Sequence, residues 1–405
     1  MTKLLEMVPE RVENKWLENI RTEAMNTFRS VGLPQPKTEI WKYTKPRDLA
    51  SDDFTTQLSQ NAESFDSDFF LSAYKIEFFN GKLENISPDF PQSISIKNIL
   101  EAGGLINKNI SLEKYPFAAL NTAFLENGIF LEIAPNVVLN KPIIFINKTN
   151  SPEENYFYNI HNLVVVGKNS SVEILEHYIY QGQEKSRYFA NIVNEIFLQE
   201  NSTLHHYKVQ EEAFKANHLA LNVVNVERNA NYNACCIQMG GNLARNETKV
   251  LLQAENAQTQ INSAYLMNGW ATIDNTTYVK HLAPHTFSDQ LVKGVVGGNA
   301  KGVFQGKIHI AKNCDKVEGN QLHRALLLSD TAEIDCKPEL EIFADDVKCS
   351  HGAATGVLDE MQLFYMQSRG ISEEDAKQML IDAYLDDVLN KIYNNDIKDW
   401  IRNRV

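Results

Sequence analysis

The chain has 405 residues, enough for two or three ordinary domains or for one elongated repeat domain with smaller ends. Its 39 basic and 52 acidic side chains give a formal charge of −13, which opposes binding to nucleic acid or anionic lipid, so we expect neither as a partner. Five irregularly spaced cysteines fit reduced thiols better than a disulfide framework. Because no apolar stretch reaches signal-peptide or membrane-span length, the sequence predicts a soluble cytoplasmic protein.

The first predicted element is an amphipathic helix over residues 13–31, which ends at Gly32 and Pro34. Its apolar side chains recur at three- and four-residue spacing, at Trp16, Leu17, Ile20, Ala24, Phe28 and Val31. An aromatic cluster around Trp41 follows, over residues 38–46. This cluster is either a binding hot spot or, as is commoner for Trp and Tyr, a hydrophobic plug beneath the helix.

Residues 51–67 are polar and are expected to form a linker that contains at most one helix. Extended structure is predicted to begin over residues 69–79, and Asn80-Gly81 is a hairpin turn signal. These boundaries predict an N-terminal helical domain over residues 1–70 and a connecting segment over residues 71–127.

Between about Gly128 and about Asp359 the sequence changes to short apolar runs separated by small polar turns, the pattern of β-strands. The predicted strands are Ile129–Ile133, Pro142–Ile146, Asn162–Val166, Val172–Leu175, Ile192–Leu198, Leu219–Val226, Val250–Leu252, Val303–Ile310 and Ala325–Leu328. We therefore predict a β core over residues 128–358.

Many of these strands lead into an asparagine followed by a small residue, a pair that suits a tight left-handed corner. The pairs are Asn169-Ser170, Asn201-Ser202, Asn229-Ala230, Asn256-Ala257, Asn299-Ala300 and Asn313-Cys314, at intervals of 32, 28, 27, 43 and 14 residues. Such self-similarity without a strict period favours a parallel β-helix, in which one corner geometry recurs between variable loops. A β-sandwich is the alternative, although within the core only Asn127-Gly128 and Asn268-Gly269 offer the hairpin turns that it needs.

Helical periodicity returns over residues 359–405, which we predict to be a C-terminal helical domain. One apolar face carries Ala376, Met379, Leu380, Ala383, Tyr384, Val388 and Ile392, and Ile381 and Leu385 widen it. Ser372 and Asp375 resemble a capping box at the start of this helix. The helix either sits deep in a core or docks on a partner protein.

A thiol and an imidazole stand two residues apart at Cys349 and His351, shortly before the predicted C-terminal helices. On an extended segment, residues i and i+2 point to the same side, so the pair offers one sulfur and one nitrogen ligand to the same space. That is half of a metal site. The pair alone equally fits a packed thiol beside a hydrogen-bonded histidine.

Motifs for other chemistry are incomplete. Residues 301–308 lack the first glycine and the final Ser or Thr of a phosphate-binding loop, so we do not expect unaided nucleotide hydrolysis. Adjacent cysteines and histidines on strands, Cys235-Cys236 and His205-His206, are expected to point one inward and one outward. Cys314 and Cys336 are expected at coil corners as small packing residues.

A β-helix enzyme acting on carbohydrate is an alternative function, because paired carboxylates could serve as acid and base. The candidate pairs are Glu333 with Asp335 and Glu339 with Glu341. A chain with reduced cysteines and no apolar leader fits that function poorly.

Several segments together resemble the SufB/SufD family of the Suf iron-sulfur cluster assembly system. The matching segments are Trp41-Lys42-Tyr43, Phe117-x-x-Leu120-Asn121, Gly240-Gly241-x-Leu243-x-Arg245, His281-x-x-Pro284-x-Thr286-x-Ser288-Asp289-Gln290, Val303-Phe304-x-Gly306-x-Ile308, Leu326-Leu327-Leu328-Ser329, Pro338-x-Leu340-Glu341-Ile342, residues 345–356 and Tyr365-x-x-x-Arg369-Gly370-Ile371. Residues 346–352 are similar to the SufD branch of this family rather than to the longer, cysteine-richer SufB branch.

The resemblance implies a mainly β fold, with a right-handed parallel β-helix core between N-terminal and C-terminal helical regions. It implies a non-catalytic scaffold subunit that forms a heterodimer with SufB, or a homodimer when isolated. The C-terminal helical domain would bind the ATPase SufC, which supplies ATP hydrolysis, and we assign that docking to Met379, Leu380, Ala383 and Tyr384 on the C-terminal helix.

The resemblance also places His351 at the position of a histidine that forms the nascent cluster site together with a SufB cysteine, and Cys349 beside it as a second candidate ligand. An iron-sulfur cluster would then be transient and present only in the complex with SufB, with no cofactor bound tightly to the isolated chain. A purely structural adaptor for an ABC-type ATPase is the nearest alternative function.

Overall fold

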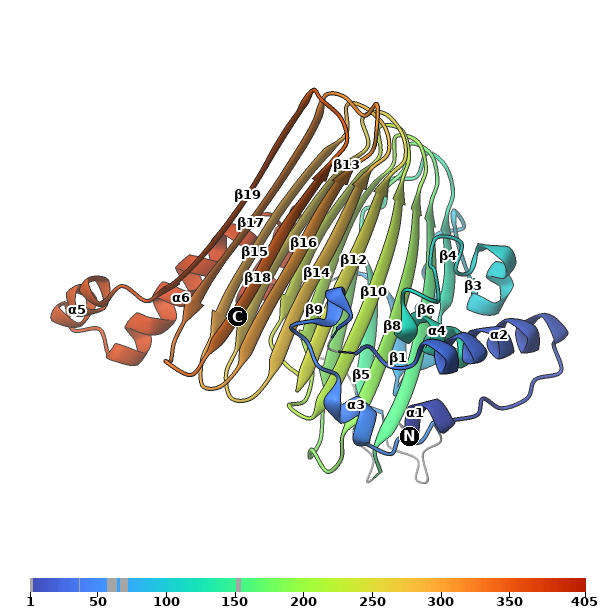
Figure 1. Ribbon diagram of the computed structural model, residues 1–405, viewed down its shortest axis with the longest axis horizontal. Coiled ribbons are helices and arrows are strands. Elements are labelled where there is room, and N and C mark those ends of the chain that lie inside the picture. The colour runs from blue at the N-terminus through green and yellow to red at the C-terminus, as the bar shows by residue number, and fades with distance from the viewer. Residues whose placement is uncertain (1–2, 36, 57–63, 66–71, 151–153) are drawn as a thin grey trace.

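The computed structural model describes residues 3–35, 37–56, 64–65, 72–150 and 154–405 (Figure 1). Its strands are Tyr74–Phe79 (β1), Lys82–Ile86 (β2), Ile94–Asn98 (β3), Ile129–Ile133 (β4), Ile143–Thr149 (β5), Tyr156–Val166 (β6), Ser171–Tyr180 (β7), Tyr188–Leu198 (β8), Thr203–Glu211 (β9), Ala216–Val226 (β10), Asn231–Gln238 (β11), Leu243–Leu252 (β12), Gln258–Met267 (β13), Thr272–His281 (β14), Phe287–Val296 (β15), Lys301–Ile310 (β16), Val317–Leu327 (β17), Glu333–Ile342 (β18) and Val347–Val357 (β19). Its helices are Lys3–Glu6 (α1), Lys15–Val31 (α2), Glu39–Trp41 (η1), Arg47–Ser51 (α3), Ile99–Leu105 (η2), Pro116–Ala123 (α4), Glu360–Ser368 (α5), Glu373–Leu389 (α6) and Asn395–Arg402 (α7).

From β4 onward, successive strands alternate between two sheets that run the length of the molecule (Figure 1). One sheet has the order β19-β17-β15-β13-β11-β9-β7-β5-β1-β2 and the other the order β18-β16-β14-β12-β10-β8-β6-β4-β3. Among the described strands, pairing is parallel throughout except between β1 and β2 and between β3 and β4. This topology is a parallel β-helix, which confirms the predicted fold class over the β-sandwich.

All nine predicted strands lie on observed strands. The hairpin predicted at Asn80-Gly81 is also confirmed, since it joins β1 to β2. β1 pairs in parallel with β5, so the solenoid sheets reach further towards the N-terminus than the predicted start at residue 128. The predicted linker over residues 51–67 and the start of the extended segment at Phe69 lie largely outside the described residues.

The recurring corner is built on left-handed backbone. Residues with positive φ stand at Asn136, Asn169, Asn201, Asn229, Asn256, His285 and Asn313, at intervals of 27 to 33 residues. The prediction at Asn299 was wrong, because Gly298 adopts the positive φ there and the corner of that coil is turned by His285. The irregular intervals of 43 and 14 residues came from that one misplaced corner.

Helices from both ends of the chain pack on the outer faces of the solenoid sheets (Figure 1). Asn14 caps α2 by accepting from the backbone N–H groups of Trp16 and Leu17, and Gly32 ends it with φ 74°, which confirms the predicted helix. Its buried face joins α4 and the outward aromatic side chains Phe157 and Phe189 of the nine-stranded sheet in one core. Trp41 belongs to this core, with its ring 5.3 Å from that of Phe117, as the plug interpretation requires.

The C-terminal helices α6 and α7 pack on the outer face of the ten-stranded sheet. Their buried side chains include Ile381, Leu385, Val388 and Trp400, which share a core with strand residues such as Tyr207. The predicted cap is confirmed, since the Ser372 hydroxyl accepts from the Asp375 backbone N–H at 3.1 Å. No helix among the described residues is long and apolar enough to cross a membrane.

Candidate functional site

Cys349 and His351 lie on β19, the outermost strand of the ten-stranded sheet, and thus on the last coil itself. Cys349 pairs with Gly319 and His351 with Gln321, two buried residues of β17. Since residues opposite one another in a parallel pair point to the same face, both side chains face the interior side of the solenoid. The structure therefore places the two candidate ligands on one face, as their spacing predicted.

The two side chains differ in exposure. Cys349 is half-buried and packs against the small core of Ile308, Ile310, Cys314 and Val317 in the last coils, whereas His351 is exposed. Burial raises the pKa of the Cys349 thiol, and the backbone of Gly319 opposes this with a hydrogen bond. Cys349 alone is therefore a poor thiolate at neutral pH, and a bound metal ion would have to displace its proton.

The described residues offer this pair no third ligand. No three His, Cys, Asp or Glu side chains within the described ranges gather closely enough to hold a metal ion. Cys336 was expected at a corner but lies in the middle of β18, half-buried on the interior side, where burial raises its pKa to about 11. Sequence reasoning missed that it shares the last coil with Cys349, because β18 was not among the predicted strands.

The end of the solenoid near these residues is uncovered. β18 and β19 are the terminal strands of their sheets, each paired on one side only. Large apolar side chains are exposed beside them, with Phe343 at 52 % and Val357 at 69 % of their full exposure. Because unpaired strand edges and exposed apolar side chains are typical of interfaces, this end has the character of an association surface.

The remaining candidate residues have structural partners. Cys236 and His206 face the interior while Cys235 and His205 face the C-terminal helices, as alternation predicted; all except the half-buried His205 are fully buried. Cys314 is buried and packs, also as predicted. The outward carboxylates of β18 form ion pairs with neighbouring bases: Glu333 and Asp335 with Lys301, Glu339 with Lys337, and Glu341 with Lys307 and His309.

The four residues predicted to bind the ATPase do not share one environment on α6. Met379 is 52 % exposed and Ala383 is also exposed, while Leu380 is half-buried. Tyr384 is half-buried against the solenoid, with the ammonium of Lys293 4.5 Å from its ring centre. Lys293 also donates to the Tyr384 carbonyl at 2.8 Å and pairs with Asp387, so this side of α6 is fixed to β15.

Helix α5 carries apolar side chains that sequence reasoning did not single out. It projects beyond the solenoid at the far end of α6 and has no buried residue (Figure 1). Met361, Phe364 and Tyr365 are 79 %, 70 % and 59 % exposed. The signal was available in the sequence, because these residues fall close together in a segment with little else to bury.

The fold defines this protein as a parallel β-solenoid of two sheets. Its uncovered last coil carries a thiol and an imidazole. Residues 147–384 match the SUF system FeS cluster assembly SufBD core domain, and residues 5–74 match the SufBD N-terminal region. The chain belongs to this SufBD family, whose system assembles iron-sulfur clusters.

Individual relatives agree with this assignment over almost the whole chain. A SufBD family protein of Synechocystis is 29 % identical over 94 % of this chain and 88 % of its own length. The SufD proteins of Escherichia coli and Bacillus subtilis are 27 % and 25 % identical, covering 92 % and 95 % of this chain and 89 % and 92 % of their own lengths. The SufB protein of Bacillus subtilis is also similar, at 24 % identity over 92 % of this chain and 85 % of that protein.

Proposed function

We propose that this chain is the SufD-type scaffold subunit of an iron-sulfur cluster assembly complex. In this proposal the open end of its solenoid pairs with SufB, and His351 and Cys349 supply part of a cluster site that SufB completes. The uncovered last coil carries the proposal, because it presents two candidate ligands on one face beside unpaired strand edges. Thiolate and imidazole are both suitable ligands for iron.

An incomplete ligand set supports a shared site in particular. A [2Fe–2S] or [4Fe–4S] cluster commonly takes four protein ligands, and the described residues of this chain bring two to the open end. The partner would therefore complete the site, and a cluster would be held only while both subunits are together. The exposed His351 is the better placed ligand, because the half-buried Cys349 already packs against its own chain.

The first test replaces the exposed imidazole. We expect His351→Ala to abolish cluster formation on the complex with SufB and SufC during anaerobic reconstitution with iron and sulfide, followed by visible absorbance. The complex should still assemble in size-exclusion chromatography, because an exposed side chain contributes little to folding. Ser350→Ala is the matched control, since Ser350 faces outward on the same strand and bonds to Asn320. An unchanged cluster yield in His351→Ala would refute the shared site.

Docking of the SufC ATPase is assigned to the exposed arm formed by α5 and the outward side of α6. Its apolar side chains are Met361, Phe364, Tyr365 and Met379, and Ala383 adds a small exposed surface. A helix that offers exposed apolar side chains without a covering core is suited to insertion into a partner groove. The Lys293 contacts to Tyr384 and Asp387 fix the arm to the solenoid. Movement of a docked ATPase on ATP binding would then displace the SufB interface and open the site to iron and sulfur.

A second test separates the arm from the open end. Met379→Asp together with Ala383→Asp should release SufC in a pull-down while SufB remains bound, because charges at a desolvated apolar contact are costly. Tyr384→Asp should by contrast lower the thermal unfolding temperature, since Tyr384 packs on the solenoid. Undiminished capture of SufC by the double variant would assign docking elsewhere. Cluster formation by the wild-type complex also distinguishes a scaffold from an adaptor, which would bind the ATPase without holding iron.

A further inference from the structure

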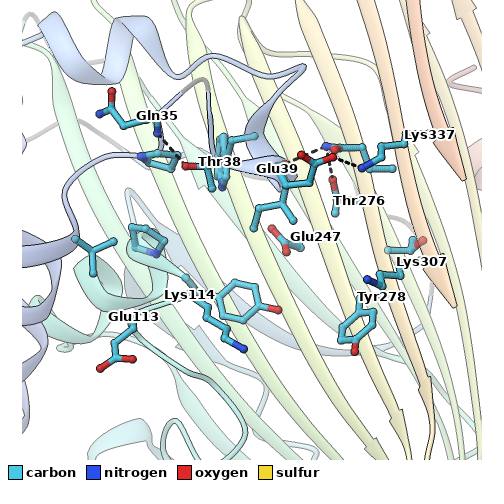
Figure 2. A pocket seen from close by; sticks show the side chains of 18 of the residues that line it. Gln35, Thr38, Glu39, Glu113, Lys114, Glu247, Thr276, Tyr278, Lys307 and Lys337 are labelled. Carbon is cyan, nitrogen blue, oxygen red and sulfur yellow. Dashed lines mark hydrogen bonds and ion pairs between the residues drawn. The ribbon is translucent and has the colours of Figure 1, made fainter. Parts of the chain in front are cut away.

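A feature that the proposed function leaves unused is a cavity of about 480 Å³ on the outer face of the nine-stranded sheet. Its roof is formed by residues 31–35 and 38–41 at and after the end of α2, one wall is formed by residues 113–116, and its floor is formed by β12, β14, β16 and β18 (Figure 2). Cavities of this size that combine apolar walls with a few polar groups are typical of small-molecule sites.

Aromatic and apolar side chains line one part of the cavity. These are Leu33 and Trp41 of the roof and Tyr115 and Pro116 of the wall. The roof is anchored, because the Gln305 side chain donates to the Ile40 carbonyl at 3.0 Å. The space is therefore a preformed, partly apolar pocket whose shape does not depend on a ligand to order it.

Lysine side chains lie close together at the other part of the cavity. Strand register puts Lys249, Tyr278 and Lys307 in one row across β12, β14 and β16, and Lys114 projects towards them from the loop (Figure 2). The pKa of Lys249 is lowered by burial first and then by the charges of Lys280 and Lys114. Lys280 and Lys114 therefore repel Lys249, although the chain as a whole has a charge of −13. A bound anion would relieve this repulsion.

The carboxylates around the cavity form ion pairs with nearby bases. Glu247 is 3.0 Å from the guanidinium of Arg245, which also pairs with Asp274, and Lys337 lies between Glu39 and Glu339. Lys307 shares Glu341 with His309. Glu113 lies on the rim, where Figure 2 shows its carboxylate turned away from Lys307 and Tyr278. Within the described residues, Lys114, Lys249 and Lys280 form no ion pair, so the Lys114 end is the more cationic part of the cavity.

We propose that this cavity binds a small organic anion. Its aromatic or apolar body lies against Trp41 and Tyr115, and its carboxylate, phosphate or sulfonate group lies between Lys114 and Lys307. Burial holds the pKa of Tyr115 above its ordinary value, so its hydroxyl stays protonated as a hydrogen-bond donor at neutral pH. The site is separate from the Cys349 and His351 pair and does not rest on the function proposed above.

The test uses the full chain and 8-anilinonaphthalene-1-sulfonate, an aromatic sulfonate whose fluorescence rises on binding. Reversing both charges with Lys114→Glu and Lys307→Glu should raise the Kd at least tenfold, a change of about 1.4 kcal/mol. Lys348→Glu, an exposed lysine on β19 outside the cavity, is the charge-matched control and should leave the Kd within twofold. Binding should also weaken with added salt.

Two further measurements place the probe and test the need for its charge. Energy transfer from tryptophan to the bound probe should fall in Trp41→Phe, because Trp41 lines the cavity. N-Phenyl-1-naphthylamine, which lacks the sulfonate, should bind at least tenfold more weakly than the sulfonate and be insensitive to the double charge reversal. An unchanged Kd in the double variant, or equal affinity for the uncharged probe, would overturn the proposal. Thermal unfolding of each variant verifies that it is folded.

Discussion

His281 is a buried histidine that its surroundings hold neutral. His281 is fully buried at the end of β14, with its two ring nitrogens 2.7 Å and 3.0 Å from the hydroxyls of Thr286 and Ser288. Burial, and secondarily the charge of His309, lowers its pKa to about 3. A hydroxyl can both donate and accept, so this pair of partners satisfies a neutral ring in either tautomer.

This arrangement predicts a loss of stability in mild acid. The unfolded histidine takes up a proton near pH 6.5 while the folded one does so only near pH 3, so between these values the unfolded state binds more protons. The contribution of His281 is therefore fully present above pH 6.5 and falls by about 1.4 kcal/mol per pH unit below it, or about 2 kcal/mol at pH 5. Urea midpoints at pH 7.5 and 5 should differ less in His281→Gln than in the wild type.

His285 provides the control for this prediction. It is exposed and turns a corner with φ 57°, a conformation that asparagine also adopts. His285→Asn should therefore keep the wild-type dependence on pH. If His281→Gln and the wild type lost the same stability between pH 7.5 and 5, the buried ring would not be the titrating group.

Individual residues also show which corners and strands of the solenoid could be predicted from the sequence. Asparagine is the usual residue for a left-handed corner, so five of the six predicted corners were found from residue type alone. His285 escaped because histidine seldom signals such a turn. Interior polar side chains hid other strands: His206 and Ser263 face inward on β9 and β13, so these strands lack the apolar runs by which strands are recognised.

At the scale of elements, the corners form a ladder that links successive coils. The amide of Asn169 donates to Asn136, that of Asn201 to Asn169, that of Asn229 to Asn201 and that of Asn256 to Asn229, all at 2.9 to 3.0 Å. Each rung is exposed, so its individual contribution is modest. The ladder keeps neighbouring coils in register because each side chain bonds to the equivalent residue one coil away.

Substitutions at Asn201 separate the contributions that the backbone and the side chain of a corner make to the free energy of unfolding. Asn201→Gly retains the left-handed corner, where φ is 60°, and loses only the two ladder bonds, so it should lower the free energy of unfolding by about 1–2 kcal/mol. Asn201→Ala also strains the corner and should lower it by about 2–4 kcal/mol. Urea denaturation followed by circular dichroism measures both. Equal losses in the two variants would show that the left-handed corner contributes nothing.

The secondary-structure elements determine which part of the candidate site could be predicted from the sequence. The spacing of Cys349 and His351 was sufficient to put them on one face, because a strand alternates its side chains. That the strand is the last of its sheet, and therefore uncovered, depends on the number of coils. Likewise the outward side of α6 could not be identified from its apolar residues, because apolar and charged residues both occur around nearly the whole circumference of the helix and only the contacts with β13 and β15 select the buried side.

For the whole molecule, the two ends of the solenoid are unequal. At the N-terminal end the sheets finish in the short antiparallel strands β2 and β3, and β2 is exposed and carries Lys82 and Glu84. Short, charged edges of this kind resist pairing with other chains. At the C-terminal end the long parallel strands β18 and β19 finish the sheets without a cover among the described residues.

This inequality predicts self-association of the isolated chain through its open end. We expect a homodimer in sedimentation velocity that Ala353→Lys converts to a monomer, because Ala353 is paired with the inward residue His323 and a lysine there would put an unpaired charge into the interface. Ala354→Lys, one residue along and on the outward face, should leave the dimer intact. The same Ala353→Lys variant should lose SufB but keep SufC, and retention of the dimer would place the interface elsewhere.

If the open end binds a partner and the opposite end does not, each molecule has one reactive end, like a monofunctional monomer in polymer chemistry. A solenoid open at both ends would add subunits without limit and grow into a fibre, because every addition would leave a new acceptor. In the predicted homodimer the joining of two open ends would consume both acceptors, so growth would terminate at two chains. The blunt strands β2 and β3 would then set the stoichiometry of that assembly from the end of the molecule that takes no part in the contact.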